Sequence, residues 1–244
     1  MEKNPRDFLA LALDNLQDIR HLRHIIELTK PFCGTYKIGL ELFTRYGPSV
    51  LDIIQESGRN IFLDLKFHDI PNTVAQAVVS ASHHRVHLCT LHTQGGKAMM
   101  LAAADAARSI REKGGLAPKL IGVTVLTSID ALSLREELCI SASLQEHVAH
   151  CASMAAAAGM DGIVCSAADL PYVKKTLPDA FEVITPGIRR SGSALHDQKR
   201  TASPAEAVSQ GATLLVIGRE VTFADNPAAA IEAIHTEISS LPLT

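Results

Sequence analysis

The feature that most limits how this chain can fold is an alternation of short β-branched, apolar segments with longer segments of helical periodicity. Repeated βα units of this kind give a parallel sheet covered by helices. Eight short segments are predicted strands, at 8–13, 35–39, 60–66, 86–92, 119–126, 162–166, 182–188 and 214–218. Helices are expected between them, with the clearest patterns at 42–56, 73–82, 97–112 and 144–158.

Eight such units without a large insertion favour a closed (β/α)₈ barrel, the TIM-barrel fold, over an open doubly wound sheet, which usually has fewer strands. No G-x-G-x-x-G follows the first strand, which further disfavours a dinucleotide-binding sheet. A length of 244 residues suits one barrel, so we expect a single domain over 1–244. The irregular stretch 189–202 predicts a mobile loop at the active site.

Bulk composition excludes several classes of protein. A net charge of −3, 4% aromatic residues and no Trp disfavour binding of a nucleic acid polymer, although a single nucleotide remains compatible. The N-terminus lacks the apolar region of a signal peptide, and no apolar run is long enough for a membrane span. The five cysteines form no C-x-x-C pair and are expected to be reduced core residues. We therefore expect a cytoplasmic protein that does not contact membranes.

Polar residues end nearly every predicted strand. Because a barrel builds its active site at the carboxyl ends of its strands, these side chains should point towards one mouth. In strand order they are Asp14, Lys37, Asp64 with Lys66, His92, Thr127 with Ser128, Ser166, Arg189, and Gly218 with Arg219.

The third strand carries the strongest signal for chemistry. Asp64 and Lys66 are two residues apart, so they lie on the same side of a strand whose neighbouring positions are apolar. A structural ion pair is one interpretation of this spacing, and a catalytic pair is the other.

Two further motifs predict a phosphate site. TPGIR at 185–189 and VIGR at 216–219 follow the seventh and eighth strands, where barrels commonly bind phosphate. Glycine exposes backbone N–H groups to an anion, and an arginine grips two phosphate oxygens at once. Turn formation with solvated arginines would explain either motif alone, but both together favour phosphate.

With these motifs in place, the sequence resembles the orotidine 5′-phosphate decarboxylase family in its bacterial form, over essentially the whole chain. The resemblance rests on ALD at 12–14, YKIG at 36–39, DLKFHDIPNT at 64–73, VTVLTS at 123–128, GIVCSA at 162–167, TPGIR with a downstream DQ at 197–198, and VIGR. Thr93 and Gln94 depart from the pattern, which has smaller residues there, and this difference concerns local packing.

The resemblance implies decarboxylation of orotidine 5′-monophosphate to uridine 5′-monophosphate and CO₂, without metal or organic cofactor. It implies a charged array of Lys37, Asp64, Lys66 and Asp69, with Lys66 as the proton donor to C6. Asp69 would reach into the site of the other subunit of a homodimer.

The same resemblance implies residues that bind the rest of the nucleotide. Asp14 and Lys37 would bind the ribose hydroxyls together with Thr73. The phosphate would be held by Arg219, the Gly218 N–H, Arg189 and Gln198. Either Thr127 or Ser128 would contact the pyrimidine, and the sequence leaves that choice open.

Two rival functions share part of this pattern. Magnesium-dependent relatives share Asp-x-Lys-x-x-Asp but have an acidic metal ligand where this chain has Lys37, whose charge would repel Mg²⁺. A catalytically silent barrel that binds nucleotides would be expected to lack one of the four charged residues, and all are present.

A zinc site at His83, His84 and His87 is disfavoured by its place at a helix end and the lack of a fourth ligand.

Overall fold

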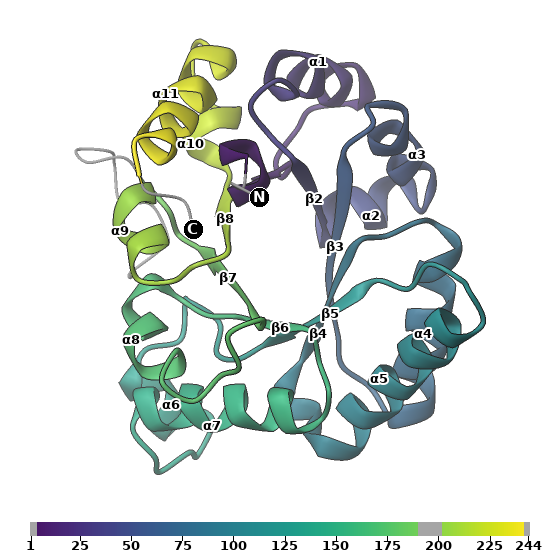
Figure 1. Ribbon diagram of the computed structural model, residues 1–244, viewed down its shortest axis with the longest axis vertical. Coiled ribbons are helices and arrows are strands. Elements are labelled where there is room, and N and C mark those ends of the chain that lie inside the picture. The colour runs from purple at the N-terminus through teal and green to yellow at the C-terminus, as the bar shows by residue number, and fades with distance from the viewer. Residues whose placement is uncertain (1–3, 190–201, 242–244) are drawn as a thin grey trace.

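The computed structural model describes residues 4–189 and 202–241 and contains a closed barrel of eight parallel strands in the order of the sequence. Figure 1 looks along the shortest axis, with the strands around the centre and the helices outside them. The strands are β1 (Leu9–Ala12), β2 (Thr35–Gly39), β3 (Asn60–Phe67), β4 (Leu88–His92), β5 (Lys119–Val123), β6 (Gly162–Val164), β7 (Glu182–Pro186) and β8 (Leu214–Ile217). The predicted (β/α)₈ barrel is confirmed.

Helices follow the strands and cover the outer surface of the barrel (Figure 1). They are α1 (Ile19–Thr29), α2 (Leu40–Tyr46), α3 (Ser49–Glu56), α4 (Pro71–His83), α5 (Gly96–Glu112), α6 (Ala131–Glu136), α7 (Leu144–Ala157), α8 (Leu170–Val173), α9 (Pro204–Ser209), α10 (Arg219–Thr222) and α11 (Pro227–Ser239). Short 3₁₀ turns, η1 (Pro5–Phe8), η2 (Thr93–Gly95) and η3 (Ala167–Asp169), complete the described elements.

The structure corrects the predicted bounds in two ways. The helix predicted at 42–56 is divided into α2 and α3, because Gly47 has a left-handed φ of 62° and Pro48 has no N–H to continue the helical bonds. Strands β5, β6 and β7 stop two or three residues before their predicted ends. The last residues of these three predicted strands lie in the loops at the carboxyl edge of the sheet.

The core has two parts. Ala10, Phe62, Ile121, Ile184 and Leu214 come from five different strands and form a cluster of their own. Four of them come from the alternate strands β1, β3, β5 and β7, as expected for side chains that fill the inside of this fold. The larger cluster lies between the outer faces of the strands and the apolar sides of the helices. The barrel is therefore packed below the carboxyl ends of its strands.

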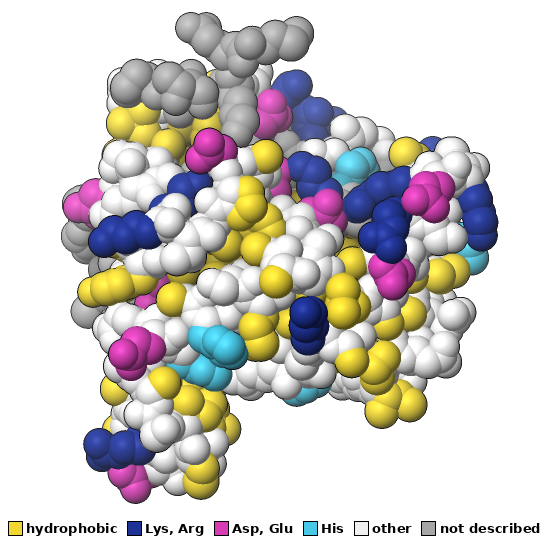
Figure 2. All heavy atoms as spheres, turned by 60° about the horizontal axis from the view of Figure 1, so that its bottom comes forward, with side chains coloured by type: hydrophobic (Ala, Val, Ile, Leu, Met, Phe, Trp, Pro, Cys, Tyr) yellow, Lys and Arg dark blue, Asp and Glu magenta, His cyan; other side chains and the backbone are white. Residues whose placement is uncertain are grey.

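The surface charges, the helix lengths and the burial of the cysteines can be compared with what the composition predicts. On the face drawn in Figure 2, lysine and arginine side chains mostly lie near acidic ones. Within the described ranges no helix has the length and apolar character needed to span a bilayer. The cysteines are free thiols, and four of them are buried, but Cys139 is exposed and is therefore not a core residue.

Candidate active site

A cavity of about 470 Å³ lies where the carboxyl ends of the strands converge. Its size suits a small ligand. The charged side chains that line it are Asp14, Lys37, Asp64, Lys66, Arg189 and Arg219. Apolar lining is supplied by Phe62, Val123, Val125, Leu126, Val164, Pro186, Ile188 and Val216, among others.

Strand β3 is irregular where it carries Asp64 and Lys66. Leu63 pairs with Cys89, and Phe67 pairs with Leu91. Between these two pairs β3 advances by four residues while β4 advances by only two. The surplus forms a β-bulge, in which Lys66 adopts a left-handed φ of 52°. Such a conformation is uncommon for a residue with a side chain and is found where neighbouring contacts impose it. The bulge brings Lys66 Nζ to 3.0 Å from Asp64 Oδ1.

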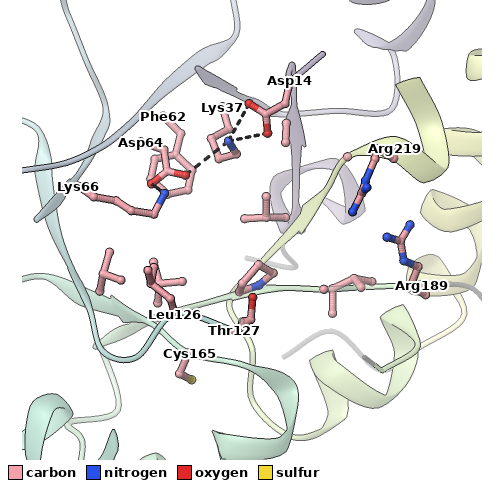
Figure 3. A pocket seen from close by; sticks show the side chains of 18 of the residues that line it. Asp14, Lys37, Phe62, Asp64, Lys66, Leu126, Thr127, Cys165, Arg189 and Arg219 are labelled. Atoms are coloured by element: carbon pink, nitrogen blue, oxygen red, sulfur yellow. Dashed lines mark hydrogen bonds and ion pairs between the residues drawn. The ribbon is translucent and has the colours of Figure 1, made fainter. Parts of the chain in front are cut away.

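Lys37 joins two carboxylates. Its Nζ lies 3.1 Å from Asp14 Oδ2 and 3.4 Å from Asp64 Oδ2 (Figure 3). The side chain is only 9% exposed and that of Asp64 only 13%, so both charges are largely removed from water. Gly39 lies beside them, and a Cβ there would be 2.8 Å from Asp14 Oδ1 and 3.2 Å from Lys37 Nζ. Glycine at 39 is therefore what allows this pair to form.

The network keeps Asp64 and Lys37 charged. Burial opposes ionisation of Asp64, but Lys37 and Lys66 outweigh it and hold the pKa of that carboxyl below its usual range. Burial likewise disfavours the Lys37 cation, yet Asp64 and Asp14 raise the pKa of its ammonium above the usual value. Asp64 therefore presents a carboxylate, and not a carboxylic acid, to the cavity at neutral pH.

The two arginines lie across the cavity from Lys66 and Asp64 (Figure 3). Gly187 has a φ of 78°, so the turn before Arg189 needs glycine. The Arg189 N–H donates to the Ala202 carbonyl at 3.0 Å, which fixes the backbone at the start of the predicted loop. Arg189 Nε is buried and has no hydrogen-bond partner within residues 4–189 and 202–241. A buried guanidinium nitrogen without a partner is suited to an anionic ligand.

Most residues predicted for the site line this one cavity. They are Asp14, Lys37, Asp64, Lys66, Thr127, Arg189, Gly218 and Arg219. Ser128 is exposed and, unlike Thr127, is not among the lining residues described. Ser166 is buried and donates to Asp169 Oδ2 at 2.6 Å, so its hydroxyl serves the local turn. Gln198 and most of the predicted loop at 189–202 lie outside the described residues.

Asp69 and Thr73 lie away from the cavity of their own chain. Both are exposed, and neither belongs to the lining described for it. Asp69 Oδ1 accepts a hydrogen bond from the Ile70 N–H at 2.7 Å, and Ile70 itself is 68% exposed. The segment around the start of α4 therefore presents a carboxylate, a hydroxyl and an apolar side chain to the outside of the chain.

Sequence reasoning missed Thr90. This residue is fully buried in β4, and its hydroxyl lies between Asp64 and the backbone of Lys66. The sequence feature that could have indicated it is a single hydroxyl in the apolar LCTLH strand at 88–92. That strand, β4, lies beside β3, which carries Asp64 and Lys66. Thr93, a departure from the family pattern, is buried as well, and its hydroxyl donates to the Val123 carbonyl at 3.0 Å.

His92 should make the stability of the fold depend on pH. Burial lowers its pKa below 6.5, and His68, whose ring centroid lies 5.3 Å away, and Lys66 lower it further. As the pH falls, His92 is therefore protonated in the unfolded chain before it is protonated in the folded protein. The folded state keeps its full stability above pH 6.5 and loses part of it as the pH falls from there through the folded-state pKa of His92. We expect the free energy of unfolding to fall in that window, by at most about 1.4 kcal/mol per pH unit for this group.

Urea unfolding at a series of pH values checks this expectation. His92→Gln should reduce the slope of unfolding free energy against pH below 6.5. The same substitution at exposed His24 is the matched control. Equal slopes in the wild-type protein and His92→Gln would contradict the assignment.

A closed eight-stranded barrel with an ionic cluster and paired arginines around one cavity at its carboxyl ends defines a (β/α)₈-barrel enzyme. Within that class, the chain belongs to the orotidine 5′-phosphate decarboxylase / HUMPS family, whose sequence profile matches residues 7–234.

Individual relatives agree with this membership. The chain is 42% identical over 236 residues to the orotidine 5′-phosphate decarboxylase of Moorella thermoacetica, covering 96% of this chain and 92% of that protein. It is 42% identical over 214 residues to the enzyme of the same name from Geobacillus thermodenitrificans, covering 86% and 90%. The crystal structure of orotidine 5′-phosphate decarboxylase from Lactobacillus acidophilus matches with a TM-score of 0.82 and 34% identity, covering 95% of this chain and 99% of that one.

Proposed function

We propose that this protein decarboxylates orotidine 5′-monophosphate to uridine 5′-monophosphate and CO₂, the last step of de novo UMP synthesis in pyrimidine biosynthesis. The observation that carries the proposal is the placing of Lys66 Nζ 3.0 Å from Asp64 Oδ1 in a cavity that also holds two arginines. The names of the relatives support the same reaction.

Asp64 and Lys66 divide the chemistry between them. The substrate carboxylate would lie near Asp64, and two unit negative charges about 4 Å apart repel by roughly 4 kcal/mol at an effective dielectric constant near 20. When the bond from C6 to the carboxylate breaks, its electron pair stays on C6 and neutral CO₂ leaves. The Lys66 ammonium stabilises that developing charge and then transfers one proton to C6, and solvent reprotonates the amine. We assign the larger share of the rate to Lys66.

Lys37 takes the place that a metal ion would need. Its Nζ lies within 3.4 Å of carboxylate oxygens of both Asp14 and Asp64, so a cation already occupies the space between them. This arrangement supports a reaction without a metal ion and disfavours the magnesium-dependent alternative. Lys37 and Asp14 would also bind the ribose hydroxyls, and Thr127, which lines the cavity, would contact the pyrimidine.

The phosphate would be bound at the opposite end of the cavity by Arg219, the Gly218 N–H and Arg189, with Gln198 contributing from beyond the described residues. Binding energy from this group, which does not react, can be used to order the reacting end.

Arg219→Ala tests the phosphate site without relying on turnover. We expect UMP to bind roughly 100-fold more weakly, because a charge-assisted contact to the phosphate is lost. Uridine, which lacks the phosphate, should bind both proteins alike. Calorimetric titration of each ligand measures the difference, and Arg20→Ala, whose side chain is 94% exposed, is the control. Equal weakening of UMP and uridine would contradict a phosphate contact.

The active unit would be a homodimer with shared sites. Asp69 and Thr73 lie outside the cavity of their own chain, and exposed Ile70 lies between them. We assign both polar side chains to the cavity of the partner subunit, where Asp69 would join the charged array and Thr73 the ribose. The buried free thiols fit a cytoplasmic protein.

The fall in ultraviolet absorbance as orotidine 5′-monophosphate becomes uridine 5′-monophosphate tests the proposal directly. We expect turnover that EDTA does not change. Loss of turnover with EDTA would favour the magnesium-dependent relatives. Tight nucleotide binding without turnover would indicate a silent barrel.

A further inference from the structure

We infer that Thr90 is a positioning residue for the reaction, whose hydroxyl sets the geometry of both Asp64 and Lys66 without touching the substrate. The inference rests on the proposed function. Thr90 lies in β4 beside the bulge of β3, is fully buried, and is not among the described residues that line the cavity.

Two hydrogen bonds connect this one hydroxyl to the charged pair. The Lys66 backbone N–H donates to Thr90 Oγ1 at 2.9 Å. The Thr90 hydroxyl in turn donates to Asp64 Oδ1 at 2.9 Å. The same Asp64 oxygen accepts from Lys66 Nζ at 3.0 Å, so Thr90, Asp64 and Lys66 form a closed ring of contacts. The Asp64 carboxylate and the Lys66 backbone are therefore each bonded to Thr90, and the Lys66 ammonium is connected to it through Asp64.

The bulge explains why a hydroxyl is needed at 90. Pairing between β3 and β4 is interrupted from Leu63 to Phe67, and the Lys66 N–H is bound by the Thr90 side chain there. Lys66 also has a left-handed φ of 52°, a conformation that persists only where its surroundings impose it. The hydrogen bond from the Lys66 N–H to the Thr90 hydroxyl stabilises this conformation.

The donor role towards Asp64 has a second effect. A hydroxyl that donates to Asp64 favours the ionised carboxylate and helps lower the pKa of that group. The acceptor and donor roles of Thr90 therefore act together. One places the lysine, and the other orients the carboxylate that opposes the substrate.

Thr90→Val is the test, because valine keeps the shape of threonine and removes the hydroxyl. We expect kcat for orotidine 5′-monophosphate to fall roughly 10- to 100-fold, since a buried hydrogen bond to a charged group is lost and the reacting groups are misplaced. The KM and the dissociation constant of UMP should change less than about threefold, because the phosphate contacts are distant. The acid side of the profile of kcat against pH should move to higher pH.

Three further variants separate positioning from packing. Thr90→Ser keeps the hydroxyl and should restore kcat to within about threefold of wild type. Thr93→Val is the matched control, because it also removes a buried hydroxyl near the end of β4 but one that bonds the Val123 carbonyl. It should leave kcat nearly unchanged. Thr90→Ala replaces Thr90→Val if the valine variant fails to fold, as thermal unfolding would reveal.

The outcomes distinguish the two levels of the proposal. A wild-type protein without turnover would overturn the proposed function and the role of Thr90 with it. An active wild type with an equally active Thr90→Val would overturn only the role of Thr90. A Thr90→Ser variant as slow as Thr90→Val would show that the hydroxyl alone does not sustain the rate, and it would also overturn the role of Thr90.

Discussion

Replacing Lys66 by alanine should lower kcat by about 10⁴-fold or more while UMP still binds. The estimate combines two losses: the ammonium that stabilises the charge at C6 and the acid that protonates it. Binding survives because the arginine end of the cavity, which would hold the phosphate, is untouched. Stopped reactions analysed for UMP measure the rate, and calorimetry measures binding.

Lys113→Ala is the control for that experiment, because Lys113 is an exposed lysine at the C-terminal end of α5. It should leave both constants unchanged. Near-normal turnover by Lys66→Ala would show that another group protonates C6.

Asp69→Ala should lower kcat by roughly 10³-fold, although Asp69 is exposed and lies outside the cavity of its own chain. If the site belonged to one chain alone, this substitution would behave as an ordinary surface change. The absorbance assay at equal protein concentration measures the difference. A loss smaller than about threefold would argue against a shared site.

Mixing two inactive variants makes the same point more sharply. After subunit exchange, a mixture of Lys66→Ala and Asp69→Ala should regain activity, because each mixed dimer contains one site with both residues intact. At equal amounts, about a quarter of all sites should be active. Lys66→Ala mixed with Asp64→Asn is the matched control, since both residues come from the same chain and no intact site can form. Activity in that control would contradict the shared-site arrangement.

The barrel itself was predictable because its signal repeats along the chain. The strand at 35–39 matches β2 in both bounds, and 60–66 differs from β3 by one residue. Apolar runs do not mark where a strand leaves the sheet, so 119–126 was too long, and Val125 and Leu126 line the cavity instead. Gly47 and Pro48 break a continuous apolar pattern that had predicted one helix.

The charged residues of the site were predictable because charges rarely end apolar strands without a reason. Their geometry was not predictable. Alternation placed Asp64 and Lys66 on one side of a regular strand, whereas a bulge with a left-handed Lys66 brings them together. Thr90 was missed because its role depends on contacts between two strands, which a single run of residues does not reveal.

The distribution of charge along the cavity has a consequence for ligand orientation. Lys37 and Lys66 balance Asp14 and Asp64, so one end is neutral as a group, while the other end carries Arg189 and Arg219. Because of this asymmetry, the two opposite orientations of an elongated ligand in the cavity differ in electrostatic energy. A nucleoside monophosphate has one strongly anionic end, so we expect this cavity to bind it in a single direction. A nucleoside without phosphate has no comparable polarity, so the cavity gives it much weaker directional preference.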